Sequence, residues 1–167
     1  MIKAHSYILK ARCPYFAAML RNVGGFSETN GQGQSYSLIQ IKNVAKPILN
    51  CVIQYLYSDS FMLLDLSMDF YLQLLIISDY FMLPRLVQIC SSYIKELMTQ
   101  QNALSVLLLA HAHNAHDLFR YCLNFVSKFE DCILMSKEWT LFKKYTDLHL
   151  YNEILGELVK FRDNFLV

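Results

Sequence analysis

Three histidines in one short segment, His111, His113 and His116, are the residues whose type and spacing first suggest chemistry. Imidazole nitrogens are common zinc ligands, and side chains three apart, such as His113 and His116, share one face of a helix. His111 and His113 point to nearly opposite sides, and only Asp117 stands close by as an acidic ligand. A tetrahedral set is therefore incomplete. We expect no bound metal, with two histidines facing solvent and one packed or at a helix end.

Covalent and cofactor chemistry lacks its usual constellations in this sequence. The five cysteines form no C-x-x-C pair and have apolar neighbours, so we expect buried, reduced thiols. They are Cys13, Cys51, Cys90, Cys122 and Cys132. There is no G-x-S-x-G motif or glycine-rich phosphate loop, and the adjacent pair Glu130-Asp131 is typical of a solvated helix end. The sequence predicts that the chain is not an enzyme and needs no cofactor.

The composition indicates a folded domain that has a partner or lacks a piece of its fold. Hydrophobic residues make up 54% of the 167 residues and charged residues 17%, and the net charge is +1. This composition excludes disorder. It also indicates that apolar surface remains to be buried. Basic residues are scattered, Lys143-Lys144 being the one adjacent pair, so nucleic-acid binding is disfavoured. No apolar run is long enough for a membrane span, and the start lacks a signal-peptide core. We expect a cytoplasmic and/or nuclear protein.

The elements that would position any site are mostly helical. Residues 24–36 hold four of the five glycines and many polar residues, which predicts an exposed loop. Short β-branched or apolar runs after it predict strands near residues 38–41 and 61–63. Pro47, Ser67, Pro84 and Asn102 are placed to open or cap helices. Apolar spacing predicts further helices around residues 118–129, 139–145 and 154–165. The architecture predicted is a small sheet followed by a stack of short helices.

Five segments, in order, resemble the landmarks of BTB/POZ domains. Residues 4–20 carry Ala4-His5, then apolar positions and Phe16, as the opening helix of that family does. Residues 37–44, 55–59 and 74–90 are similar to its following strand, its Y-x-Y-S-D turn and its L-L-x-x-S-D helix pair. The stretch from Asn102 onward resembles a BACK-type helical extension. The layout is nearest to ankyrin-repeat BTB proteins and the inhibitor-of-Bruton-kinase type.

This resemblance implies an α+β, mostly helical fold, in which a small sheet with helix pairs is followed by a helical extension. Residues 1–98 would be the BTB/POZ-like domain and residues 99–167 the BACK-like extension. The chain departs from the family at Cys13, where serine is usual, and in having no helix and strand hairpin before the Ala4-His5 motif. Because those elements supply most of the usual dimer interface, the fold is expected to be incomplete, and homodimerisation stays open.

The resemblance also implies a function, which is to adapt an unidentified substrate protein to a cullin scaffold of a ubiquitin ligase. In cullin-binding members, a hydrophobic-x-Glu element in the loop before the strand inserts into the cullin, and Phe26-x-Glu28 matches it. Tyr57 and Asp59 at the following turn are weaker candidate contacts. Phe26 folded back onto the domain remains an alternative for the loop. Self-association in a scaffold or transcription complex is the alternative function, and an enzyme or metal protein using the histidines is the third.

Overall fold

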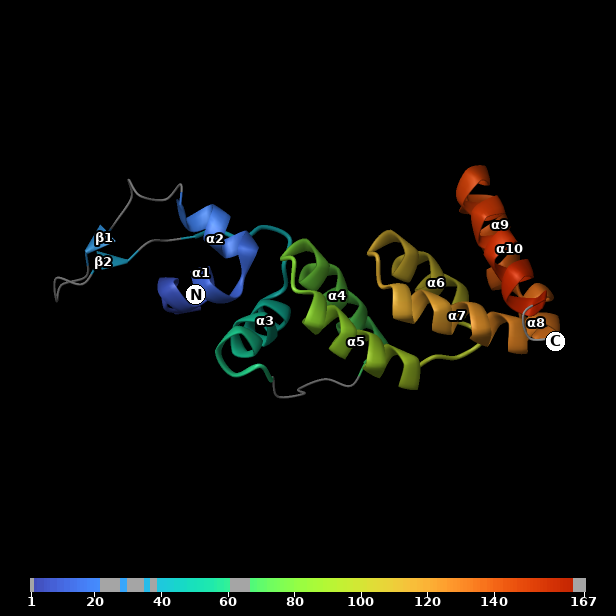
Figure 1. Ribbon diagram of the computed structural model, residues 1–167, viewed down its shortest axis with the longest axis horizontal. Helices are drawn as coiled ribbons and strands as arrows, with labels where there is room; N and C mark the ends of the chain where they lie inside the picture. The colour runs from blue at the N-terminus through green and yellow to red at the C-terminus, as the bar shows by residue number, and fades with distance from the viewer. Residues whose placement is uncertain (1, 22–27, 30–34, 37–38, 61–66, 164–167) are drawn as a thin grey trace. The chain divides into compact units, whose positions relative to one another are not determined.

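The computed structural model describes residues 2–21, 28–29, 35–36, 39–60 and 67–163, which are mostly helical (Figure 1). The described residues form ten helices and one pair of very short strands. The chain divides into two compact units, Met1–Cys90 and Ser91–Val167. None of the described helices has both the length and the apolar character needed to cross a membrane.

The first unit is built from five helices, of which α5 runs on into the second unit. They are α1 (Ser6–Arg12), α2 (Pro14–Arg21), α3 (Lys46–Ser58), α4 (Met68–Tyr80) and α5 (Pro84–Glu96). Helix α1 contacts both α2 and α3, and α3 also contacts α4. These contacts bring the start of the chain against a helix that begins some 40 residues later in the sequence.

The sheet of the first unit differs from the one expected. Strands β1 (Glu28–Thr29) and β2 (Ser35–Tyr36) pair antiparallel, with Glu28 opposite Tyr36 and Thr29 opposite Ser35. They lie in the glycine-rich stretch predicted to be a loop. Residues 39–42 are not a strand, because no described segment pairs with their backbone. Residues 37–38 and the expected strand at 61–63 lie outside the described residues.

Several helix boundaries follow the capping signals in the sequence. Pro47 lies in the first turn of α3, Pro84 is the first residue of α5, and the Ser67 hydroxyl accepts the Phe70 N–H at 3.3 Å as the cap of α4. These three predictions are confirmed. Ser136 caps α9 in the same way, by accepting the Trp139 N–H at 3.1 Å.

Asn102 precedes its helix as predicted but does not cap it. Helix α6 begins at Ala103, directly after Asn102, and ends at Ala112. The backbone of Asn102 is already helical, so its side chain turns back toward the preceding turn instead. Its Oδ1 accepts the Thr99 N–H at 2.8 Å, and its Nδ2 donates to the Leu97 carbonyl at 3.3 Å. The amide therefore stabilises the loop before α6.

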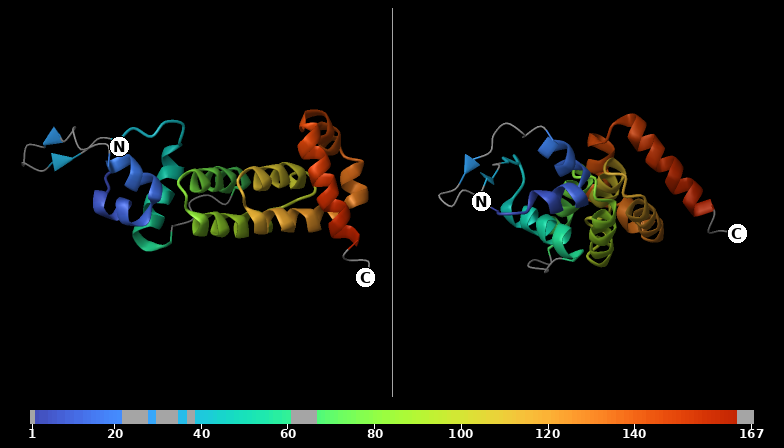
Figure 2. Two further views of the ribbon diagram at one scale, coloured as in Figure 1. Left: turned by 45° about the horizontal axis from the view of Figure 1, so that its top comes forward. Right: turned by 60° about the vertical axis from the view of Figure 1, so that its left-hand side comes forward.

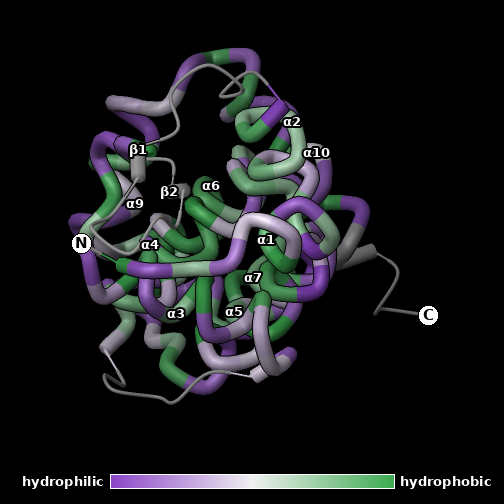
Figure 3. Tube along the Cα trace, turned by 90° about the vertical axis from the view of Figure 1, so that its left-hand side faces the viewer, coloured by the Kyte–Doolittle hydropathy of each residue, from purple (hydrophilic) through white to green (hydrophobic). Residues whose placement is uncertain are grey.

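The core of the first unit is made by the apolar faces of these helices. Figure 3 shows hydrophobic positions alternating with hydrophilic ones along the helices, as expected when one face is buried. The fully buried large side chains of this unit are Phe16, Leu56, Tyr71, Leu74, Leu75, Phe81 and Leu86. Helix α4 buries residues on several sides, including Ser78, whose hydroxyl donates to the Leu74 carbonyl at 2.6 Å. That bond lets a polar residue lie in an apolar core.

The second unit is entirely helical in its described part. After the end of α5 it contains α6, α7 (His116–Lys128), α8 (Glu130–Leu134), α9 (Lys137–Tyr145) and α10 (Leu148–Asp163). Helices α6 and α7 lie side by side, and α10 packs on α7 (Figure 2). Leu107, Leu118, Ile133 and Ile154, on α6, α7, α8 and α10 in turn, are fully buried. Sequence reasoning missed α8, whose first turn holds Glu130 and Asp131, where carboxylates favour a helix N-terminus.

Candidate protein-interaction surface

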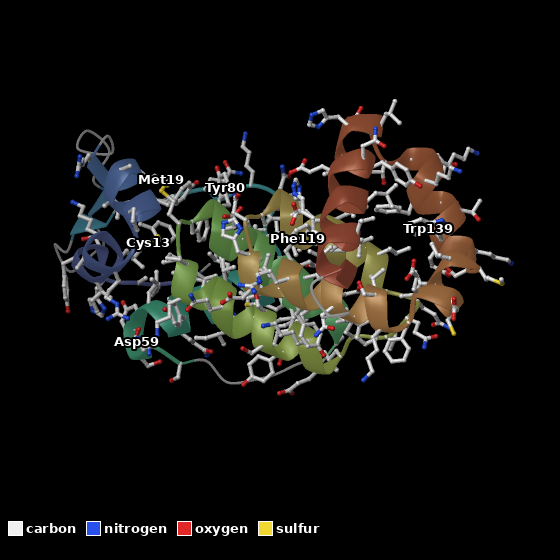
Figure 4. The ribbon with its side chains drawn as sticks, turned by 45° about the vertical axis from the view of Figure 1, so that its right-hand side comes forward. Cys13, Met19, Asp59, Tyr80, Phe119 and Trp139 are labelled. Atoms are coloured by element: carbon white, nitrogen blue, oxygen red, sulfur yellow. The ribbon has the colours of Figure 1, made fainter. Side chains whose placement is uncertain are left out.

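Helix α1 is bonded at both of its ends to the last turn of α3. At its start, the Tyr57 hydroxyl accepts the His5 backbone N–H at 2.6 Å and lies 2.7 Å from His5 Nδ1. At its other end, the Arg12 guanidinium forms an ion pair with the Asp59 carboxylate. Asp59 itself ends α3 in the left-handed conformation, with φ 57°, which an aspartate tolerates (Figure 4).

The structure therefore brings together two of the four residues named as partner contacts. Tyr57 is 43% exposed and the Asp59 side chain 42%, so each keeps a free face while it is bonded to α1. Their bonds to His5 and Arg12 give them a structural task that the sequence did not reveal. His5 and Arg12 belong to the segment that resembles the opening helix of BTB/POZ domains.

The other two predicted contacts are placed only in part. Glu28 lies in β1, where its backbone is paired with that of Tyr36. Phe26 lies outside the described residues. The backbone beside the Phe26-x-Glu28 element is thus held in a short antiparallel pair, between helices α2 and α3 in the sequence.

An aromatic cluster fixes α2 against the turn between α4 and α5. The ring of Phe81 is stacked on that of Tyr15, with 4.6 Å between the centroids, and lies 5.2 Å from that of Phe16. The ring of Tyr80, at the end of α4, lies 5.1 Å from that of Tyr15, measured between the centroids. Burial and the bond to Tyr80 raise the pKa of Tyr15 to about 12. Cys13 Sγ donates to the Phe81 carbonyl at 3.4 Å. The start of the chain is therefore packed on the α4–α5 turn.

A groove of about 340 Å³ opens where α1, α3 and the α4–α5 turn meet. Its lining residues are Ala11, Arg12, Tyr55, Asp59, Met82, Leu83, Pro84 and Arg85. Met82 stands 62% exposed in the left-handed conformation with φ 57°. Sequence reasoning did not name Arg85. A left-handed methionine leaves no signal in the sequence, whereas a cation directly after the helix-opening Pro84 could have been noticed.

The histidines of the second unit do not form a metal centre. Among the described residues, no group of three histidine, cysteine or acidic side chains could hold an ion. His111 lies 5.4 Å from the Phe119 ring, and its Nε2 lies 3.4 Å from Glu153 Oε1. His116 is exposed at the start of α7, and His113 is half-buried at the end of α6. His111 thus keeps contact with solvent while α10 brings Glu153 to it.

The four buried cysteines are unsuited to nucleophilic chemistry. Burial raises the pKa of Cys90 and of Cys122 to about 12, which leaves the reactive thiolate unpopulated at neutral pH. Cys13 and Cys51 are buried too, and burial raises the pKa of each. All five are free, but Cys132 is exposed, contrary to the expectation that every cysteine is buried. It lies on α8, the helix that the sequence pattern did not reveal.

Comparisons with known proteins agree on the kind of domain. The family model for the BTB/POZ domain matches residues 1–98, which end two residues after α5. Kelch-like protein 8 of Caenorhabditis elegans is 26% identical over 140 residues, 83% of this chain and 19% of its own. The inhibitor of Bruton tyrosine kinase of Mus musculus is 30% identical over 124 residues, 73% of this chain and 9% of its own.

A third relative, Kelch-like protein 38 of Danio rerio, is 27% identical over 109 residues. That match covers 65% of this chain and 17% of the relative. The chain thus spans less than a fifth of the length of these curated relatives. Both the kelch-like and the Bruton-kinase-inhibitor kinds appear among them.

Proposed function

The chain belongs to the BTB/POZ domain family, and from that premise we propose that it is a substrate adaptor of a cullin-RING ubiquitin ligase. The BTB/POZ domain is a non-catalytic protein-interaction module, followed in this chain by a helical extension. Two of the similar proteins are kelch-like. The proposed partners are a cullin scaffold and a substrate protein, with no cofactor, nucleic acid or membrane. The compartment proposed is the cytoplasm and/or the nucleus.

The observation that carries the proposal is the Phe26-x-Glu28 element beside the β1–β2 pair. One aromatic side chain on a loop, with a carboxylate to fix its register, is the design of an interface hot spot. The pairing of Glu28 with Tyr36 restricts the backbone next to the element, so less entropy is lost when a partner binds. In this proposal Phe26 enters a cullin pocket and Glu28 sets its orientation.

Tyr57 and Asp59 are proposed as secondary contacts through their exposed faces. Both are held in place by bonds to α1, and a fixed side chain loses little conformational entropy on binding. Residues 99–167 are proposed to be a BACK-like extension that lengthens the cullin contact and separates the ligase from the substrate. The described part of this segment is helical, with buried faces on α6, α7, α9 and α10.

Calorimetric titration of the chain with the N-terminal repeats of a BTB-binding cullin tests the proposal. Saturable binding is expected, and Phe26→Ala should weaken it by about 2 kcal/mol if Phe26 is a buried anchor. Gln32→Ala, in the same polar stretch, is the matched control and should leave the affinity unchanged. A folded, monodisperse chain that does not bind, or equal affinities of the Phe26→Ala and Gln32→Ala variants, would contradict the proposal.

A self-association module without a ligase role is the second candidate. It is favoured by exposed large side chains on the first unit, Tyr7, Tyr80 and Met82, each more than half exposed. Such side chains on one domain favour association with another protein surface. Sedimentation of the chain at increasing concentration separates the two candidates. A concentration-dependent oligomer together with no cullin binding would favour this second function.

A further inference from the structure

The groove between α1, α3 and the α4–α5 turn carries an excess of positive charge. Its lining holds two arginines, Arg12 and Arg85, and one carboxylate, that of Asp59. Asp59 is engaged by Arg12. Arg85 is exposed and forms no hydrogen bond or ion pair with any residue the structure describes. Among the described residues, the Arg85 cation at the groove thus has no anionic partner.

Two residues at the rim depart from what their local backbone prefers. Met82 holds a left-handed conformation that glycine or asparagine usually occupies at the end of a helix. Arg85 places a positive charge in the first turn of α5, which has no acidic residue there and where the helix dipole favours an anion. Residues that break local rules without a gain in the fold concentrate at functional sites. Both of these face the same groove.

The groove also has an amphipathic floor and rim. The Tyr55 side chain is 5% exposed, and burial raises the pKa of its phenol, so it stays neutral there. Met82 contributes an unbranched, polarisable side chain, of the kind that adapts to many apolar partners. A ligand for this groove therefore needs one negative group and one apolar group next to each other. Neighbouring side chains of a peptide supply that combination.

We infer that the groove binds a short acidic segment of a partner protein, with an Asp or Glu carboxylate on Arg85 and an adjacent apolar side chain on Met82. Charge complementarity selects this occupant, because the guanidinium of Arg85 can take a carboxylate in a bidentate pair. The inference goes beyond the proposed cullin contact, since it uses two residues that the contact does not need. It holds whether or not the chain binds a cullin.

Selection of short linear peptides from a display library, with the full chain as bait, tests the inference. The enriched peptides are expected to carry Asp or Glu beside Leu, Ile, Met or Phe. Replacing the acid by its amide in a synthetic copy should weaken binding about tenfold or more, as measured by fluorescence anisotropy. Synthetic peptides with phosphoserine in place of the Asp or Glu show whether the groove binds a phosphate rather than a carboxylate. Enrichment of no such motif, or binding that needs the phosphate, would overturn the inference.

Variants of the chain place the binding in the groove. Arg85→Glu is expected to abolish binding of the acidic peptides, and Arg85→Gln to weaken it about tenfold. Met82→Gly, which suits the left-handed backbone, should weaken binding without unfolding the chain. Arg120→Glu makes the same charge change on the exposed side of α7 and should leave the affinity unchanged. Equal peptide affinities of the Arg85→Glu and Arg120→Glu variants, with circular dichroism unchanged, would show that the site lies elsewhere.

Discussion

Replacing Met82 by glycine should stabilise the protein, although it removes a whole side chain. Helix α4 ends in a Schellman motif, in which the Leu83 N–H donates to the Ser78 carbonyl at 2.8 Å and the Met82 N–H to the Asp79 carbonyl at 2.9 Å. This motif places residue 82 at φ 57°. Asn114 occupies the same position at the end of α6, with φ 51°, and asparagine tolerates it.

The magnitude follows from three terms. The left-handed region raises the free energy of the folded state by about 1–2 kcal/mol for a residue with a Cβ atom, but not for glycine. Glycine loses about 0.5–1 kcal/mol through the greater freedom of the unfolded chain. Because Met82 is 62% exposed, its side chain contributes little burial to the fold. We expect a net gain of about 0.5–1 kcal/mol in the free energy of unfolding for Met82→Gly.

Urea denaturation followed by circular dichroism measures this gain. The midpoint should rise while the slope stays the same, because the variant exposes the same surface on unfolding. Met82→Ala is the matched control, since it removes the side chain but keeps the Cβ atom and its backbone cost. Its stability should stay within about 0.5 kcal/mol of the parent. A glycine variant less stable than the alanine variant would refute the reasoning from the left-handed turn.

Three further predictions concern side chains that stabilise the inside of one unit or the other. Tyr57→Phe should lower the free energy of unfolding by about 1 kcal/mol, because the hydroxyl that bonds to His5 is lost; unchanged stability in urea would show that the bond contributes nothing. Phe81→Ala should lower the free energy of unfolding by about 3–5 kcal/mol, since the ring is fully buried in the aromatic cluster. A loss under about 1 kcal/mol would mean that the cluster does not hold α2 in place. The free energy of unfolding should fall as the pH rises from 9 toward 12. The thiols of Cys90 and Cys122 ionise near their ordinary pKa of 9.0 in the unfolded chain, but only at about 12 in the folded protein. High pH therefore favours the unfolded state. The double variant with both cysteines replaced by alanine should lose part of this decline, and an identical pH profile would contradict its cause.

The sequence by itself determined the family of this protein and most of its helices. The signals at Pro47, Ser67 and Pro84 act within one turn of the chain, so a local pattern is enough to place the helices that they open. The BTB/POZ landmarks are likewise spaced along the chain and can be recognised in order. The prediction that Asn102 caps α6 was wrong because the same side chain could also bond to the loop before it.

Only the tertiary structure decided which residues meet. His5 and Tyr57 are 52 residues apart, and Arg12 and Asp59 are 47 apart, so no local pattern pairs them. The left-handed backbone of Met82 follows from how α4 ends against Leu83, a buried residue. The excess charge of the groove exists only because α1, α3 and the α4–α5 turn converge there. Contacts of this kind depend on how helix faces pack, which the order of residues along one helix does not specify.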